Sequence, residues 1–219
     1  MKFKKAIVTS GGTREWIDPV RYISNASSGK MGFHLAENIS NWIEDTVYIY
    51  GNVLEKYANF QGRRKSVETT IDMLNAILDE ISQDTLIVMA AAPADFKPQE
   101  YSETKIKKTD QEYLIKLSNN PDILHTISQI IEEKKISGVH RVGFAAETND
   151  LESNAMKKIS NKKLDYIIGN TVGRNIGFGD KESSVKIFSS NGLEAHFESL
   201  SKEVLAKEIV LYLKNKFNS

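Results

Sequence analysis

The sequence predicts an α/β fold of three layers, in which helices cover both faces of a mostly parallel sheet and a β-hairpin is added near the C-terminus. Short apolar runs alternate with segments of helical periodicity along most of the chain, as in parallel sheets with crossover helices. The run TLIVM at 85–89 is apolar throughout, as expected for a strand buried on both faces. The turn Ser190-Asn191-Gly192 lies between two strand-like runs and predicts a hairpin.

The first half of the chain alternates between strand and helix. Leu35, Ile39 and Trp42 fall on one stripe of a helix, and the apolar residues between Val67 and Ile81 recur at the same spacing. The strands are short apolar runs of the usual length. The expected elements are strands at 3–9, 46–50 and 85–89 and helices at 31–42 and 67–81.

The second half continues this order and ends in a different pattern. We place Pro121 at the first position of a helix, where its missing N–H has no effect on the hydrogen bonding. Ser201 is a candidate N-cap for the last helix, whose Leu205, Ile209 and Leu213 recur four residues apart. The expected elements are strands at 139–144, 165–168, 185–189 and 193–197 and helices from 121, at 148–162 and from about 201.

The composition restricts the class of protein. The 219 residues carry 29 Lys and Arg against 29 Asp and Glu, so the net charge is zero and a general nucleic-acid binder is not expected. Cysteine is absent and the four histidines are scattered, which argues against zinc sites and iron–sulfur clusters. The G-x-S-x-G motif of serine hydrolases is also missing. Because no repeat or low-complexity linker occurs, we expect one domain over 1–219.

The distribution of apolar residues argues against a membrane protein. No apolar run reaches the ~18 residues that a membrane span requires. The N-terminus begins MKFKK, and only Ala6, Ile7 and Val8 follow before polar residues. This apolar stretch is too short for a secretory signal, so we expect a cytoplasmic protein.

Two long connections, at 10–30 and 91–113, directly follow apolar strands. Both are rich in Gly, Pro, Ser, Asn and charged residues. Loops of this length in a compact domain are usually functional, and open α/β sheets bind ligands beyond the carboxyl ends of their strands. These two connections are therefore the first place to look for a site.

The first connection has features suited to a phosphate. Gly11 and Gly12 let the backbone approach an anion closely, and Thr13 adds a hydroxyl. Ser28 and Gly29 open a helix whose free N–H groups and positive dipole end would attract an anion. A glycine turn followed by an ordinary helix cap is the simpler alternative. The segment lacks the first glycine of a Walker A loop and the third glycine of a dinucleotide fingerprint.

The second connection begins with small residues and continues with lysines. Ala91 and Ala92 leave room for a ligand against the backbone, and Asp95 follows them. Lys105 starts the run KIKK at 105–108, which on its own is typical of a solvated charge run. Its position on a long polar loop instead favours a mobile lid over about 97–112 that brings lysines to phosphate.

Three further candidates follow later in the chain. Phe144 stands at the end of a strand, and Lys158 and Lys162 are four residues apart, so they share one face of a helix near the ligand edge. Taken alone, such a phenylalanine is more often a core residue, and such lysines are more often ordinary surface residues.

Together these segments resemble the phosphopantothenate–cysteine ligase family of coenzyme A biosynthesis. The signature GGTRE..DPVR.ISN.SSGKMG stands at 11–32, and the resemblance implies a Rossmann-like or ribokinase-like sheet. In many bacteria a flavin-dependent decarboxylase precedes the ligase, and without a counterpart to it the chain looks like a stand-alone bacterial ligase. The supporting motifs are AA.ADF at 91–96, KIKK at 105–108, NPDIL at 120–124, GFAAET at 143–148 and the paired lysines before LDYIIGN.

The resemblance implies a two-step reaction. The carboxylate of 4′-phosphopantothenate attacks the α-phosphorus of a nucleoside triphosphate, which expels pyrophosphate and gives an acyl-nucleotide. The amine of L-cysteine then attacks the acyl carbonyl and releases the nucleoside monophosphate. Mg²⁺ on the triphosphate would offset its charge. The family uses CTP in most bacteria and ATP in eukaryotes; we expect CTP, while base preference and metal ligands stay open.

The resemblance also implies roles for individual residues. Asn25 matches the catalytic asparagine that holds the acyl carbonyl, and Lys105 matches the lid lysine that faces the α-phosphate. Arg21 matches an arginine that helps to bind the substrate phosphate across a homodimer, and the hairpin at about 184–198 resembles a dimerisation arm. The other substrate positions are Ala91 and Ala92, and the nucleotide positions are Gly11, Gly12, Thr13, Ser28, Gly29, Asp95, Pro121, Asp122, Ile123, Leu124, Phe144, Lys158 and Lys162.

Two rival interpretations share the same start of the fold. A Rossmann-type reductase would also begin with a strand, two glycines and a helix, but the dinucleotide fingerprint is incomplete. A non-catalytic nucleotide-binding regulator is the second rival. The presence of Asn25 and Lys105 beside phosphate-compatible loops favours an enzyme.

Overall fold

An eight-stranded sheet forms the centre of the computed structural model, which describes residues 3–108, 110, 112–147, 150–171 and 182–218. Its strands are β1 (Lys5–Ser10), β4 (Thr46–Tyr50), β5 (Arg63–Ser66), β6 (Thr85–Met89), β9 (His140–Glu147), β10 (Tyr166–Thr171), β11 (Ser183–Ser189) and β12 (Gly192–Leu200). They lie in the order β12-β11-β10-β9-β6-β1-β4-β5, and all neighbours from β10 to β5 are parallel. Because β11 and β12 add antiparallel at one edge, the mostly parallel sheet with a C-terminal hairpin is confirmed.

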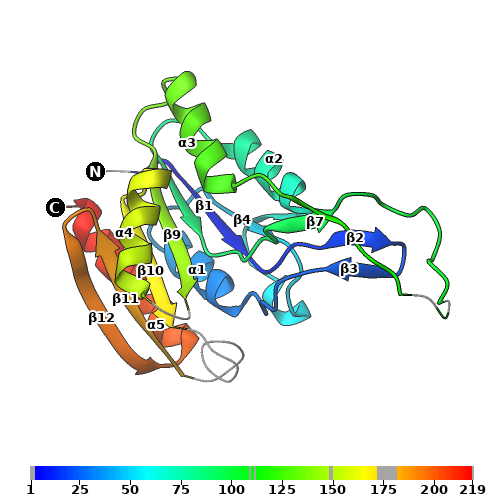
Figure 1. The fold of residues 1–219 in the computed structure, drawn as a ribbon. Coiled ribbons are helices and arrows are strands. Elements are labelled where there is room, and N and C mark those ends of the chain that lie inside the picture. The colour runs from blue at the N-terminus through cyan, green and yellow to red at the C-terminus, as the bar shows by residue number, and fades with distance from the viewer. Residues whose placement is uncertain (1–2, 109, 111, 148–149, 172–181, 219) are drawn as a thin grey trace.

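Helices cover both faces of the sheet, which confirms the three layers (Figure 1). Each face has its own buried cluster, and β1 serves both because Val8 points to one and Ile7 to the other. One face carries α1 (Lys30–Ser40) and α5 (Lys202–Asn218), and the other carries α2 (Thr70–Glu80), α3 (Ile123–Glu133) and α4 (Leu151–Lys162). None of the helices in the described ranges is long and apolar enough to cross a membrane.

Both long connections contain short strands, where the sequence predicted only loop. The first holds the hairpin of β2 (Glu15–Asp18) and β3 (Arg21–Ile23), and the second holds β7 (Phe96–Pro98) paired with β8 (Leu117–Asn119). In Figure 1, β2, β3 and β7 extend together away from the main sheet. These strands are too short and too polar to show a period of two. The charged edge strand β5 was missed for the same reason.

Several helices begin later than expected because a capping residue fixes their first turn. Asp122 is the N-cap of α3 and accepts a hydrogen bond from the His125 N–H at 3.1 Å, so Pro121 precedes the helix and is not its first residue. Thr69 caps α2 in a reciprocal capping box, so α2 starts at 70 and not at 67. The predicted start of α4 at 148 falls outside the described residues, which show the helix from 151. The cap at Ser201 is confirmed, since its hydroxyl accepts from the Val204 N–H at 3.3 Å.

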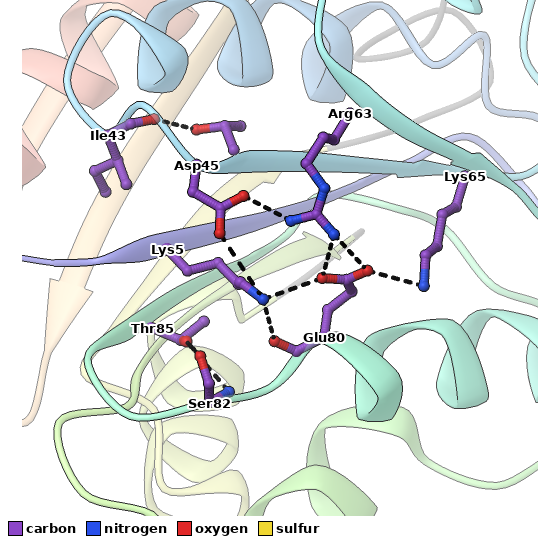
Figure 2. A network of polar contacts seen from close by, with 9 residues as sticks. Lys5, Ile43, Asp45, Arg63, Lys65, Glu80, Ser82 and Thr85 are labelled. Atoms are coloured by element: carbon purple, nitrogen blue, oxygen red, sulfur yellow. Dashed lines mark hydrogen bonds and ion pairs between the residues drawn. The ribbon is translucent and has the colours of Figure 1, made fainter.

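The end of the sheet that holds the start of β1 carries a dense ion network (Figure 2). Glu80, at the end of α2, has a side chain only 7% exposed and contacts Lys5 at 3.1 Å, Arg63 at 3.0 Å and Lys65 at 2.9 Å. Burial alone would raise the pKa of Glu80, but hydrogen bonds from Lys65 and Lys5 and the charge of Arg63 lower it to about 2. The network joins the ends of β1, β5 and α2.

Candidate active site

The strand order creates a crevice between β1 and β6. From β1 the chain continues through α1 to β4 on one side, whereas β6 and the strands after it lie on the other side. Connections that leave two neighbouring strands in opposite directions open a gap beyond their carboxyl ends, and ligands of α/β proteins bind there. Both long connections begin at this point, as expected from the sequence.

The two connections are joined directly by their backbones. The Ala92 N–H donates to the Gly11 carbonyl at 2.8 Å, and the Ala91 N–H donates to the Thr9 hydroxyl at 3.1 Å. Gly11 has a φ of +79°, a conformation that favours glycine. The glycine loop and the alanine loop therefore form one continuous surface over the ends of β1 and β6.

Asn25 lies at the junction of these loops. Its side chain is exposed, and its amide Nδ2 donates to the Pro93 carbonyl at 2.9 Å. A Cβ at Gly12 would lie 2.7 Å from the Asn25 carbonyl oxygen, so the first loop packs on the Asn25 segment only because position 12 has no side chain. The amide expected to act in catalysis is thus held at the Pro93 carbonyl, directly after the alanine loop, where Gly12 packs on the Asn25 backbone.

A buried cluster of polar side chains lies next to this junction and fixes both loops. Glu15 is only 4% exposed, and its carboxylate accepts from the Thr70 N–H at 2.9 Å, the Thr70 hydroxyl at 2.8 Å and the Thr13 hydroxyl at 3.1 Å. The Thr13 hydroxyl also accepts from the Ala94 N–H at 2.9 Å. Thr13 is fully buried, so this geometry makes it a support of the loop and gives no support to its expected contact with a ligand.

The start of α1 borders a cavity of about 230 Å³. Gly29 is the N-cap, with a φ of +80° and no side-chain capping bond, and its carbonyl accepts from the Ser10 hydroxyl at 2.8 Å. The Lys30 N–H, the first of the helix, donates to the Ser28 hydroxyl at 3.4 Å, and the start of a helix is a place where anions bind. The cavity is lined by residues 26–32, 90–92 and 144–146, together with Asn170, Ser183, Val185 and Lys202.

The other face of the sheet holds a second group of predicted residues. Ile123 and Leu124 are buried against α2 and α4, and the carboxylate of Asp122 contacts the Lys162 ammonium at 2.8 Å. Burial alone would raise the pKa of Asp122, but the hydrogen bonds from Lys162 and the His125 N–H outweigh it and lower that pKa. Lys158 lies one turn earlier on α4.

The lysine run lies on the projecting arm formed by β2, β3, β7, β8 and the described residues between β7 and β8. Lys105 is exposed, and the next residue, Ile106, is held at both backbone groups. The Ile106 carbonyl accepts from the Arg21 guanidinium at 2.9 Å, and the Ile106 N–H donates to the Asp18 carboxylate at 3.1 Å. Asp18 is fully buried and ion-paired to Arg21, which keeps the pKa of this carboxyl well below its usual range. Arg21 thus anchors the lysine segment through its contacts with Asp18 and Ile106.

The structure brings some predicted residues together and separates others. Gly11, Gly12, Asn25 and residues 91–92 meet over β1 and β6, and Asp95 follows with an exposed side chain. Phe144 points to the α1 and α5 face, whereas residues 121–124 and Lys162 lie on the opposite face. Lys158 and Lys162 occupy the later turns of α4, and the Lys162 ammonium reaches the N-terminus of α3 through its contact with Asp122.

Sequence reasoning missed several residues that shape the site. Glu15 and Asp18 stand inside the first motif, but no signal in the sequence showed that they would be buried. Asn170, Ser183 and Lys202 come from distant elements and reach the cavity only through the sheet order. Within the described part of the chain, no group of three or more His, Asp or Glu side chains could hold a metal ion.

Comparison with known proteins places this geometry in a family. Coenzyme A biosynthesis bifunctional protein CoaBC of Vibrio vulnificus is 37% identical over 211 residues, which cover 94% of this chain and 51% of that protein. The chain thus spans about half the length of the curated relatives it matches.

Solved structures agree with this comparison. The crystal structure of the C-terminal domain of CoaBC has a TM-score of 0.76 at 26% identity, covering 100% of this chain and 97% of that one. The DNA/pantothenate metabolism flavoprotein of Streptococcus pneumoniae shares the fold, with a TM-score of 0.79 at 21% identity over 97% of this chain and 99% of that one. Since the family model for the C-terminal domain of DNA/pantothenate metabolism flavoproteins matches residues 1–216, the chain belongs to that family, which confirms the resemblance seen in its motifs.

Proposed function

We propose that the chain catalyses the joining of 4′-phosphopantothenate to L-cysteine in coenzyme A biosynthesis, with CTP rather than ATP as co-substrate. The observation that carries this proposal is the position of Asn25, whose exposed amide lies where the glycine loop and the alanine loop meet over β1 and β6. Membership of the family supports the substrate class.

The proposed chemistry begins with activation of a carboxylate. A carboxylate oxygen attacks the α-phosphorus of the triphosphate, a P–O bond forms, and pyrophosphate leaves. The amine of cysteine then attacks the acyl carbonyl, and the nucleoside monophosphate leaves as the amide forms. The Asn25 amide N–H would donate to the carbonyl oxygen as negative charge develops on it, and removing one such donor typically reduces the rate ~10²–10³-fold.

The surrounding residues would mainly position the substrates. The start of α1, next to Ser28 and Gly29, suits a phosphate group because helix N-termini attract anions. Lys105 would bring positive charge to the α-phosphate from its exposed segment, and the mobility of this lid stays a prediction. Positioning and electrostatic stabilisation suffice for such a reaction because the nucleotide supplies the leaving group.

Mg²⁺ fits the site as a companion of the nucleotide. It commonly keeps several waters and is held by substrate phosphates with one or two carboxylates, so the absence of a three-ligand cluster among the described residues agrees with this mode. Asp95, exposed at the start of the second connection, is the carboxylate we would assign to it. The ion would offset charge on the triphosphate.

A homodimer and a cytoplasmic location stay predictions. β12 is the outermost strand of the sheet, and an unpaired strand edge can pair with a second copy. The expected role of Arg21 across such an interface would require its guanidinium to leave or extend its present contacts with Asp18 and Ile106.

Pyrophosphate release is the direct test of the proposed function. The purified chain is incubated with CTP or ATP, with and without 4′-phosphopantothenate, and cysteine is omitted in one series. We expect pyrophosphate only when both the acid and CTP are present, and amide product only after cysteine is added. Asn25→Ala should reduce amide formation about 10²-fold or more while nucleotide binding stays within a few fold. No acid-dependent pyrophosphate with either triphosphate would refute the proposal.

A further inference from the structure

Arg14 lies between the glycine loop and the β2–β3 hairpin, and the proposed reaction gives it no role. Its guanidinium Nη2 donates to the side-chain carbonyl of Asn52 at 2.6 Å, and its Cζ lies over the Tyr22 ring, 5.0 Å from the ring centre. The Arg14 backbone N–H donates to the Glu68 carbonyl at 2.8 Å, which fixes the start of the side chain. One arginine thus joins segments that follow β4, form β3 and precede α2.

Both contacts of the guanidinium lead to the Asn25 segment. Tyr22 is on β3, three residues before Asn25. Asn52 exchanges two backbone hydrogen bonds with Gly12, at 2.6 and 3.2 Å, and Gly12 packs directly on the Asn25 backbone. Arg14 therefore holds the Asn25 segment from two sides, through the preceding strand and through the glycine loop.

The position of the Asn25 amide depends on its backbone. The side chain is exposed, and its amide donates to the Pro93 carbonyl at 2.9 Å. The hairpin that leads to it has strands of four and three residues, and a two-stranded hairpin is marginally stable by itself. A group that acts on a reacting carbonyl has to be held within about 0.5 Å of its productive position. A tether between the hairpin and the main sheet supplies this precision.

The two contacts require a guanidinium in particular. A flat guanidinium can stack on an aromatic ring and donate hydrogen bonds from its edge at the same time, whereas the compact ammonium of a lysine cannot. The Arg14 Nε is buried and has no hydrogen-bond partner in the part of the chain that the structure describes. A buried donor without a partner is destabilising, and an apolar side chain would pack here without that effect. The position therefore favours the geometry of the guanidinium over stability.

We propose that Arg14 is a positioning residue for the Asn25 amide. By holding Tyr22 and Asn52 together, it fixes the place of Asn25 over the ends of β1 and β6. It therefore acts on the attack of the amine on the acyl carbonyl and not on the binding of the nucleotide. The reaction to which it contributes rests on the proposed function, whereas the tether rests on the contacts of Arg14.

Rate measurements on single and double variants test this assignment. The value of kcat for amide formation is measured with saturating CTP, 4′-phosphopantothenate and cysteine, and the affinity for CTP by equilibrium titration. We expect Arg14→Ala to lower kcat about 10–10²-fold, as for displacement of a reacting group, and to change CTP affinity by less than about threefold. Because Arg14 acts through Asn25, adding Arg14→Ala to Asn25→Ala should lower kcat further by less than about twofold.

Two other variants separate positioning from folding. Arg64→Ala is the matched control, since Arg64 is exposed on β5 and donates to the Ala58 carbonyl at 3.0 Å. Ala58 and Arg14 line the same cavity of about 650 Å³, and the loss of this surface contact should leave kcat within about twofold. Arg14→Lys keeps the charge and most of the packing. It should melt close to the temperature of the unmodified chain and still lower kcat, by less than Arg14→Ala does.

The possible failures are distinguishable. An Arg14→Ala kcat equal to that of Arg64→Ala, or a loss of the same factor with and without Asn25→Ala, overturns this inference alone, because the unmodified chain is active in both cases. A loss that falls on CTP affinity and leaves kcat unchanged also overturns it. If Arg14→Ala does not fold, Arg14→Lys takes its place in the double variant and the same comparisons decide. If the unmodified chain forms no amide, the proposed function fails and this inference fails with it.

Discussion

Removal of the charge of Glu80 should destabilise the fold by a measurable and pH-dependent amount. Glu80→Gln keeps the shape of the side chain but ends its ion pairs with Lys5, Arg63 and Lys65. The pKa falls from 4.5 to about 2 on folding, and at 1.36 kcal/mol per unit this sets a ceiling of about 3 kcal/mol. The side chains of Arg63 and Lys65 are 53% and 37% exposed, so solvent screening reduces the expected loss to roughly 1–2 kcal/mol.

The pH dependence has a definite sign. The folded state binds the Glu80 proton less readily than the unfolded state, so the stabilisation is complete above about pH 4.5 and is lost as the pH falls toward about 2. The difference in free energy of unfolding between the unmodified chain and Glu80→Gln should therefore be largest at pH 7 and shrink by more than half near pH 3. Other carboxyl groups titrate in both proteins and cancel in the difference.

Urea unfolding at pH 7, 5 and 3, followed by circular dichroism, measures this difference. Asp79→Asn is the matched control, since Asp79 is the neighbouring residue on α2 and is exposed; it should change stability by less than about 0.5 kcal/mol. A Glu80→Gln loss that stays the same from pH 7 to pH 3, or that does not exceed the Asp79→Asn value at pH 7, would refute the electrostatic argument.

Two further predictions concern the site. Gly12→Ala places a methyl group 2.7 Å from the Asn25 carbonyl oxygen and should displace Asn25. We therefore expect kcat for amide formation to fall about 10²-fold while nucleotide binding stays nearly unchanged. An unchanged kcat would contradict this. Asp18→Asn removes the charge that pairs with Arg21 and weakens the hydrogen bond from the Ile106 N–H. Trypsin should therefore cleave within 105–108 faster than in the unmodified chain. The KM for the nucleotide should rise by a larger factor than kcat falls. Equal cleavage rates in both proteins would exclude this anchoring role.

The alternation of apolar strands and amphipathic helices made most of the fold predictable. Five-residue runs such as 85–89 are apolar at every position because both faces of β6 are covered. The arm was not predictable in the same way. β7 pairs with β8 across a long polar segment, and neither strand has enough residues to show alternation. Its strands are held by partners that are distant in sequence.

The burial of the polar side chains near the site could not be predicted from sequence patterns either. Glu15 and Asp18 look like surface residues in a charged loop, and they are buried only because Thr70 and Arg21 supply hydrogen bonds to them. Ser183 belongs to a hairpin whose serines have no distinguishing neighbours in the sequence. The position of Asn25, in contrast, followed from a motif that joins one strand to one helix.

The division of the predicted nucleotide residues between two faces follows from the order of the strands. A crossover between parallel strands is right-handed. The step from β1 to β4 runs in one direction along the sheet, and the steps from β5 to β6, β6 to β9 and β9 to β10 run in the other.

Connections that run in opposite directions must lie on opposite faces, so α1 is separated from α2, α3 and α4. A substrate that contacts both Phe144 and Asp122 therefore has to lie across the carboxyl ends of the strands. Among the described strands the direction changes only between β1 and β6, which is where the structure holds Asn25.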